Sequence, residues 1–161
     1  IQCLYILLRR RRRVTISIIL SVFLVLITFY IHLIILKFLY IRIPHVKISN
    51  YHQVLLIIIT LFVVHIVEIG LYATCYDVST NYFKIGSLHG KNINSLMEYM
   101  YYSTVIYTSL GLGDVYPIGH LRFITGIEAL NGLMLITWSA SFTFLVMKRL
   151  WPWSDTCSDK K

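Results

Sequence analysis

Residues 108–114 read TSLGLGD and lie between two largely apolar stretches, YYSTVIY before them and VYPIGH after them. Gly111 and Gly113 alternate with leucine here, and a lone aspartate, Asp114, ends the segment. Glycine adopts left-handed backbone conformations at little steric cost. A backbone that alternates between left- and right-handed residues turns successive carbonyl oxygens toward one side. The segment therefore predicts a strip of carbonyl oxygens that can replace the hydration shell of a cation.

The composition of the chain is typical of a membrane protein. Of its 161 residues, 57% are hydrophobic and only 14% are charged, with a mean hydropathy of +0.71. Soluble domains average about 25% charged residues, so lipid is expected to be the main solvent of this single domain. The run Arg9–Arg13 could bind nucleic acid. Next to a long apolar stretch, it indicates instead a charge cluster that flanks a membrane span, without a nucleic-acid partner.

The sequence contains few candidates for chemistry. Cys3, Cys75 and Cys157 form no CxxC pair, so neither a zinc site nor a disulfide framework is expected. No nucleophile–base pair or phosphate loop is recognisable, so no enzymatic activity and no organic cofactor are expected. The chain opens with Ile1 and its first methionine is Met97, which predicts an unusual start codon or residues upstream.

Three long apolar stretches predict three transmembrane helices, at 14–36, 53–75 and 121–147. Each is long enough to cross a bilayer core of about 30 Å. Pro44 breaks the helix after the first stretch. Lys148–Arg149 and nearby tryptophans end the third, which is typical of a helix anchored at the membrane interface.

The segment between the second and third stretches follows a different pattern. Residues 76–94 are polar with glycines and predict an outer loop that reaches to Ser95. Ser95 and Glu98 have capping-box spacing, so a helix is predicted over about 96–107. That helix is only about 18 Å long, and irregular backbone after a helix too short to span indicates a re-entrant loop. The predicted fold class is an all-α membrane protein; a surface loop with one interfacial helix is the alternative.

TSLGLGD resembles the potassium-channel signature T-T-V-G-Y-G-D, and residues 95–147 resemble the two-helix pore module of that superfamily. Residues 101–103, YYS, fall where many potassium channels carry two tryptophans and a serine, an aromatic cuff around the filter. Residues 115–117, VYP, are similar to the segment after the signature. HIVEIGLYA (65–73) and GIEALNGLMLITWSASF (126–142) are similar to small bacterial ion-channel proteins with three predicted spans.

This resemblance implies a passive potassium channel of four identical chains in a bacterial inner membrane, with the helix over 121–147 lining the lumen and Gly132 near its hinge. The residues implied for the filter are Thr108, Ser109, Leu110, Gly111, Leu112, Gly113 and Asp114. Potassium would bind to Ser109, Leu110, Gly111 and Leu112, and the last two filter residues would close the outer mouth. Tyr101 and Tyr102 would support the filter.

Two residues depart from the signature. Ser109 keeps the hydroxyl of the usual threonine but lacks the methyl group that stiffens the side chain. Leu112 replaces a tyrosine whose phenol often bonds behind the filter. Potassium selectivity remains the prediction, and a poorly selective monovalent cation channel is the alternative in the same class. A non-conducting membrane subunit and a haem-binding electron-transfer protein are alternatives from other classes.

Four polar residues inside the predicted spans are candidates for function. Glu68 and Glu128 are expected near the outer leaflet, level with the filter, and at least one is expected to support the pore loop from behind. A helix–helix hydrogen bond, or a carboxylate directed to the outer surface, is an equal alternative. His32 and His65 could ligate haem or a metal. Without a second evident set of ligands, histidines satisfied by helix packing are the favoured interpretation.

Positive charge gives conflicting indications of topology. A filter at the outer face places the loop 37–47 and the short tail 148–161 in the cytoplasm, as the positive-inside rule prefers. A complete crossing by the first span would put Arg9–Arg13 outside, against that rule, so either the native start differs or the first span does not cross. The five consecutive arginines surround a helix instead of forming one stripe, so weak voltage dependence is expected.

Overall fold

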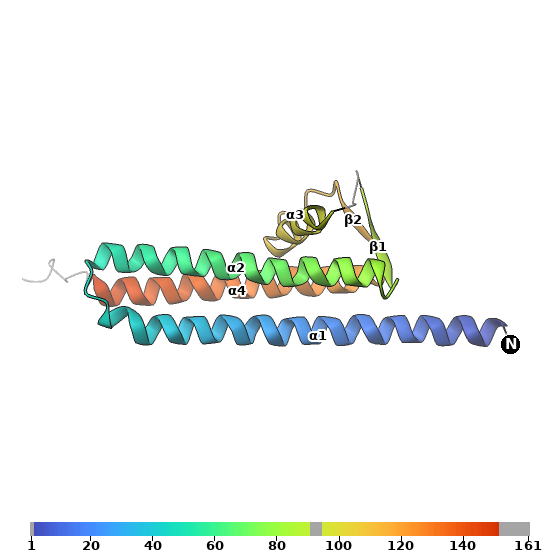
Figure 1. The fold of residues 1–161 in the computed structure, drawn as a ribbon, viewed down its shortest axis with the longest axis horizontal. Helices are drawn as coiled ribbons and strands as arrows, with labels where there is room; N and C mark the ends of the chain where they lie inside the picture. The colour runs from blue at the N-terminus through green and yellow to red at the C-terminus, as the bar shows by residue number, and fades with distance from the viewer. Residues whose placement is uncertain (1, 91–94, 152–161) are drawn as a thin grey trace, which may run out of the picture.

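The computed structural model describes residues 2–90 and 95–151 and is largely helical (Figure 1). In chain order its elements are α1 (Gln2–Arg42), the 3-10 turn η1 (Ile43–His45), α2 (Asn50–Asn81), β1 (Gly86–His89), α3 (Leu96–Tyr107), β2 (Tyr116–Gly119) and α4 (Leu121–Leu150). Three stretches are long and apolar enough to cross a membrane: Arg11–Arg42, Asn50–Asn81 and Leu121–Leu150. The three predicted spans are therefore present.

Each long helix extends beyond the apolar stretch that predicts it. Residues 76–81, predicted to be part of the outer loop, continue α2, and β1 lies within the same predicted loop. Tyr76 and Ser79 are completely buried, so contacts with neighbouring elements extend the helix past the end of its apolar stretch. Residues 91–94 of that loop lie outside the described residues.

The three long helices form a bundle in which α1 and α4 run in the same direction and α2 runs in the opposite one (Figure 1). α1 packs along α4 and, less extensively, along α2. The start of α2 is joined to the end of α4, because Asn50 Nδ2 donates a hydrogen bond of 2.7 Å to Leu150 O. α1 is one unbroken helix along the bundle, which is consistent with a first span that crosses completely.

A pair of strands joins the two ends of the segment that contains α3. β1 follows α2 and β2 precedes α4, and the two strands pair antiparallel with Gly86 opposite Gly119 and His89 opposite Tyr116. The all-α prediction lacked these strands. The two strands thus join the bundle at the same end, and α3 lies across α2 and α4 (Figure 1).

The short helix α3 has the predicted bounds, but not the predicted cap. Ser95 is the N-cap residue with extended backbone, and its side chain makes no capping hydrogen bond to the described residues. Instead, the Glu98 N–H donates to the Ser95 carbonyl at 3.1 Å. The glycine-containing segment that follows Tyr107 ends the helix, as predicted.

Two apolar clusters hold the bundle together. The first packs α3 and the strand pair against α2 and α4, and it contains Tyr72, Tyr76, Tyr102, Leu121 and Ile124. The second lies at the opposite end of the bundle, where Leu36, Leu39, Ile57 and Leu61 pack beside Trp138. Many large apolar side chains on the outside of the long helices are exposed, as expected for surfaces that face lipid or another copy of the chain.

Candidate ion-conducting site

The backbone of the TSLGLGD segment alternates in handedness as the sequence predicts. Ser109, Gly111 and Gly113 have φ of +57°, +60° and +79°, whereas Leu110 and Leu112 between them do not have positive φ. The alternation thus starts at Ser109, two residues before the first glycine. A left-handed conformation costs a residue other than glycine about 1–2 kcal/mol, so Ser109 holds a strained conformation that the glycine pattern did not reveal.

The inner end of this segment is attached to the last turn of α3 by its backbone. Ser109 N–H donates to Ile106 O, and Leu110 N–H donates to Val105 O, both at 2.9 Å. Gly111 N–H also approaches Val105 O, at 3.4 Å. These donors satisfy carbonyls at the helix end that would otherwise lack partners.

The middle of the segment is not packed against other described residues. A Cβ atom added at Gly111 or Gly113 would meet no atom of the described residues within 4 Å. The side chains of Leu110 and Leu112 are 63% and 58% exposed. The segment therefore lies on an open surface of the isolated chain.

The two tyrosines predicted to support the filter have different partners. Tyr101 Oη donates a hydrogen bond of 2.7 Å to Asp114 Oδ2, which joins α3 to the outer end of the segment. This hydrogen bond raises the pKa of the exposed Tyr101 phenol above its usual value. Tyr102 is buried, and its hydroxyl lies 2.8 Å from Thr125 Oγ1 on α4. Tyr101 therefore contacts the predicted filter directly, whereas Tyr102 attaches α3 to α4.

Glu128 connects three helices behind α3. This completely buried carboxyl group on α4 accepts hydrogen bonds from Ser103 Oγ on α3 and from Tyr76 Oη on α2. Ser103 Oγ also lies 2.9 Å from Ile69 O. Glu128 therefore contacts the helix that precedes the filter, and not residues 108–114 themselves.

Glu68 contacts α3 one turn further along. Tyr107 is the last residue of α3, and its Oη donates a hydrogen bond of 2.5 Å to Glu68 Oε2. Nδ1 of His32 and Nδ1 of His65 each lie 3.0 Å from an oxygen of the same carboxyl group. Glu68 is completely buried, so it is not directed to the outer surface. It contacts the residue immediately before Thr108, where the predicted filter begins.

Gly132 allows α4 to approach the end of α3 closely. A Cβ atom at this position would lie 2.2 Å from Tyr107 O. α4 continues as one helix through Gly132, so in this structure the predicted hinge glycine is a position of close packing.

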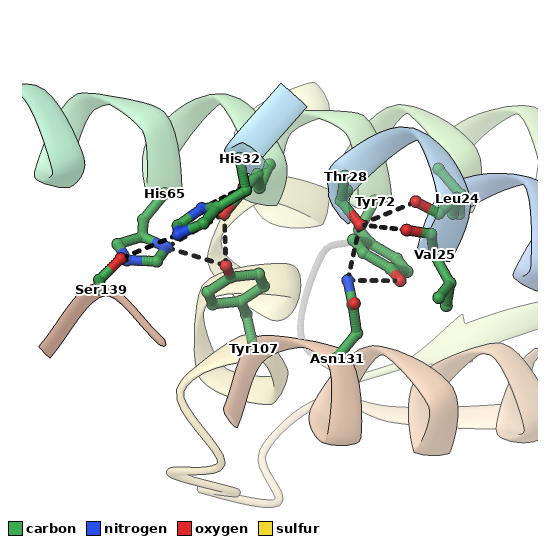
Figure 2. A network of polar contacts seen from close by, with 10 residues as sticks. Leu24, Val25, Thr28, His32, His65, Tyr72, Tyr107, Asn131 and Ser139 are labelled. Carbon is green, nitrogen blue, oxygen red and sulfur yellow. Dashed lines mark hydrogen bonds and ion pairs between the residues drawn. The ribbon is translucent and has the colours of Figure 1, made fainter. Parts of the chain in front are cut away.

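The sequence pattern did not identify Tyr76, Tyr107, Thr125 and Ser139 as functional candidates. A signal for Tyr76 and Thr125 exists, because polar residues recur at helical spacing within each apolar span: Thr28 and His32; His65, Glu68, Tyr72 and Tyr76; Thr125, Glu128 and Asn131. Residues three or four apart share one face of a helix, and a polar face inside a membrane span points to the bundle interior. Figure 2 shows Thr28, Tyr72 and Asn131 meeting between the helices, where Asn131 Nδ2 donates to Thr28 Oγ1 and Tyr72 Oη.

The structure has three apolar spans. Between the second and the third lies a segment, bounded by two strands, that carries a short helix and a backbone of alternating handedness. This arrangement is that of an integral membrane protein with a pore module. The model of a family described as "Ion channel" matches residues 53–149, which is more than half of the chain. The chain therefore belongs to this ion channel family, which is a family of channels and not of enzymes. The match runs from α2 into α4 and leaves out α1. Neither the curated proteins nor the solved structures compared with the chain gave a match.

Proposed function

We propose that this chain is one subunit of a passive potassium-selective channel, in which Thr108–Asp114 of each copy lines a common axis. The observation that carries the proposal is the alternating backbone at Ser109, Gly111 and Gly113, on a surface that no atom of the described residues covers at the two glycines. Such a backbone directs successive carbonyl oxygens to one side, and rings of backbone carbonyls replace the hydration shell of potassium in channel filters.

Electrostatics support a cation as the transported ion. α3 ends at Tyr107, directly before the filter segment. The C-terminus of a helix carries a partial negative charge of about half an elementary charge. In a symmetric assembly the ends of several copies of α3 would face the same axis, so their dipoles would add to the attraction for a cation.

A homotetramer follows from the need to surround the ion. One strip of carbonyls contacts an ion on one side only, so the filter requires several copies, and four is the number in the channel architecture that the segment resembles. The exposed apolar side chains of α4, among them Leu130, Leu133 and Met134, would then face the lumen or a neighbouring copy. We place the assembly in a bacterial inner membrane.

The selectivity is proposed to favour potassium in spite of Ser109 and Leu112. The alternative is a poorly selective monovalent cation channel, and these two departures from the signature favour it. Both hypotheses require the same rings of carbonyl oxygens. They differ in how rigidly the filter keeps its diameter.

The decisive experiment is potassium flux into liposomes that contain the purified protein. We expect flux that barium blocks, a tetramer by mass measurement in detergent, and a reversal potential under bi-ionic conditions that favours potassium over sodium. Gly111→Ala should abolish flux and leave the tetramer intact, because a Cβ atom at φ +60° is strained. Equal permeability to the two ions would replace potassium selectivity by the cation-channel alternative. A monomer without flux would refute the proposal.

A further inference from the structure

A closed ring of polar contacts lies behind the inner end of α3. His32 Nδ1 lies 3.0 Å from Glu68 Oε1, and His65 Nδ1 lies 3.0 Å from Glu68 Oε2. Nε2 of the same two histidines lies against a single hydroxyl, Ser139 Oγ, at 3.1 and 3.0 Å. Tyr107 Oη lies on the carboxyl side of the ring, 2.9 Å from His65 Nδ1. Figure 2 shows His32, His65, Tyr107 and Ser139 converging from four helices.

The number of protons restricts the states of this ring. Its four contacts between Glu68, His32, Ser139 and His65 need one proton each. Two neutral imidazoles and one serine hydroxyl supply only three. Without a bound cation, all four contacts are hydrogen bonds only if the ring holds one additional proton, shared between the imidazoles and the carboxyl group.

A metal ion satisfies the same groups without that additional proton. If both imidazoles carry their proton on Nε2, Ser139 Oγ can accept from both rings, because a hydroxyl has two lone pairs. The two Nδ1 lone pairs then face the Glu68 carboxylate. Histidines that bind metals usually donate their second ring N–H to such an acceptor, which orients the ring.

We propose that His32, His65 and Glu68 bind a divalent transition-metal ion of the Zn²⁺ class, with Tyr107 Oη as a fourth donor. The donor atoms of the two histidines and the carboxylate lie within 4.8 Å of one another. A tetrahedral zinc site has metal–ligand distances of about 2.0–2.2 Å, so the donors need only a modest contraction. Imidazole nitrogen favours zinc, copper or nickel over magnesium, calcium or an alkali ion.

The charge of the site also fits a divalent ion. His32 and Glu68 are completely buried, and an uncompensated ion in such a place is costly. Glu68 supplies one negative charge, and loss of the Tyr107 proton supplies a second. Binding of one Zn²⁺ would release the Tyr107 proton and the additional proton of the ring. The site is therefore neutral both before and after the ion binds.

His65 provides a path to the site. Its side chain is 17% exposed, and it lines a groove between α2 and α3 together with Phe62, Ile66, Met100, Thr104 and Tyr107. The site joins α1, α2 and α4 to the last residue of α3, directly before the filter. An effect of the metal on conduction would rest on the proposed channel function, whereas metal binding itself does not.

The test is a titration of the chelator-treated full-length protein with Co²⁺, which absorbs visible light strongly in tetrahedral sites and weakly as the aqueous ion. We expect the strong absorption to saturate at about one ion per chain and Zn²⁺ to abolish it by competition. In weak buffer, Zn²⁺ should release about two protons per ion bound. Zn²⁺ should also raise the melting temperature of the wild type.

Variants distinguish this site from adventitious binding. His65→Gln should lose the Co²⁺ absorption, and Ser139→Ala, which removes no ligand, should weaken binding by about 10–100-fold. His52→Gln is the matched control, because His52 is exposed and, among the described residues, hydrogen-bonds only to Ser49, beside an edge-on contact with the Tyr51 ring. Absorption like that of the aqueous ion in the wild type would refute the inference, as would equal binding by the wild type and His65→Gln. Saturable binding without ion flux would support the metal site while refuting the channel function.

Discussion

At the scale of single residues, the proposed filter region depends on how closely backbone atoms can approach one another. Gly132 lets α4 pass directly beneath the carbonyl of Tyr107, and the next residues are those of the filter. The structure therefore places a small residue where any side chain would displace the start of the filter. Gly126 is the useful comparison, because it lies on the same helix with open space around it.

We expect Gly132→Ala to reduce potassium flux strongly, because its Cβ atom would lie 2.2 Å from Tyr107 O and something must move. Overpacking of this kind costs about 1–3 kcal/mol, so thermal stability should also fall. Gly126→Ala should retain flux and stability, since a Cβ atom there meets nothing within 4 Å among the described residues. Liposome flux and melting temperature measure both effects. Equal behaviour of the two variants would contradict the close contact.

A second prediction concerns the hydrogen bond between Tyr101 and Asp114. The bond raises the pKa of the phenol above about 10, the usual value. Because the folded pKa is higher than the unfolded one, the contact is present below about pH 10 and is lost as the pH rises through the raised pKa. The absorbance titration of the wild type minus that of Tyr101→Phe should show a phenol that ionises late. Asp114→Asn should shift that titration toward pH 10; an unchanged curve would contradict the hydrogen bond.

A third prediction concerns Leu112, which stands where the family signature has tyrosine. Leu112→Tyr restores a phenol that can bond behind the filter, so the ratio of potassium to sodium permeability should rise. The bi-ionic reversal potential measures the change directly. Leu110→Ile is the control, because it alters an apolar filter side chain without adding a hydrogen-bonding group. A lower ratio in Leu112→Tyr would show that leucine is itself the better residue in this filter.

At the scale of elements, α3 is positioned by side chains from α2 and α4. Its middle is bonded through Ser103 to Glu128, and its end is bonded through Tyr107 to Glu68. The strand pair closes the base of the whole segment. These contacts restrain the helix that precedes the proposed filter, so a change in the buried carboxyl groups should be transmitted to residues 108–114 through α3.

We expect Glu128→Gln to lower the selectivity for potassium, because the amide replaces a carboxyl group that accepts from two hydroxyls. A hydrogen bond contributes about 0.5–1.5 kcal/mol net, and a loss of about 1.4 kcal/mol in discrimination is tenfold. Glu98→Gln is the control on α3 itself, since the Glu98 side chain has no hydrogen-bond partner among the described residues. Unchanged permeability ratios in Glu128→Gln would show that this carboxyl group only holds helices together.

At the scale of the whole molecule, α1 decides the topology. It is one helix from Gln2 to Arg42, and its first half packs near the strand pair, since Ile16 and Leu20 contact the apolar cluster that contains Leu88. The end with Arg11–Arg13 therefore lies on the side of the filter. The arginines on this side still conflict with the positive-inside rule. An α1 too short to extend along the bundle does not explain the conflict, because α1 is one continuous helix.

The topology can be tested with single cysteines in a background that lacks the native ones. A maleimide that does not cross membranes should label Arg12→Cys and Ser87→Cys from the same side, and Ser49→Cys from the opposite side. The reason is that α1 and α2 run antiparallel along the full bundle (Figure 1). Labelling of Arg12→Cys together with Ser49→Cys would show that α1 does not cross the membrane.

Several features could be predicted because they depend on the residues themselves. The three spans follow from runs of apolar residues, whose transfer from water to lipid is favourable in any arrangement. The bounds of α3 and the alternating backbone follow from local properties, above all the absence of a Cβ atom in Gly111 and Gly113. The family match over residues 53–149 confirms the prediction of an ion-channel pore module.

Other features were decided by contacts between residues that are distant in the chain. His32 and Ser139 are 107 positions apart, and only the packing of α1 against α4 brings them together around Glu68. The same holds for the extension of α2 past Cys75 and for the close contact at Gly132. A buried polar group is stable only where a partner satisfies it, and the position of that partner is a property of the folded chain.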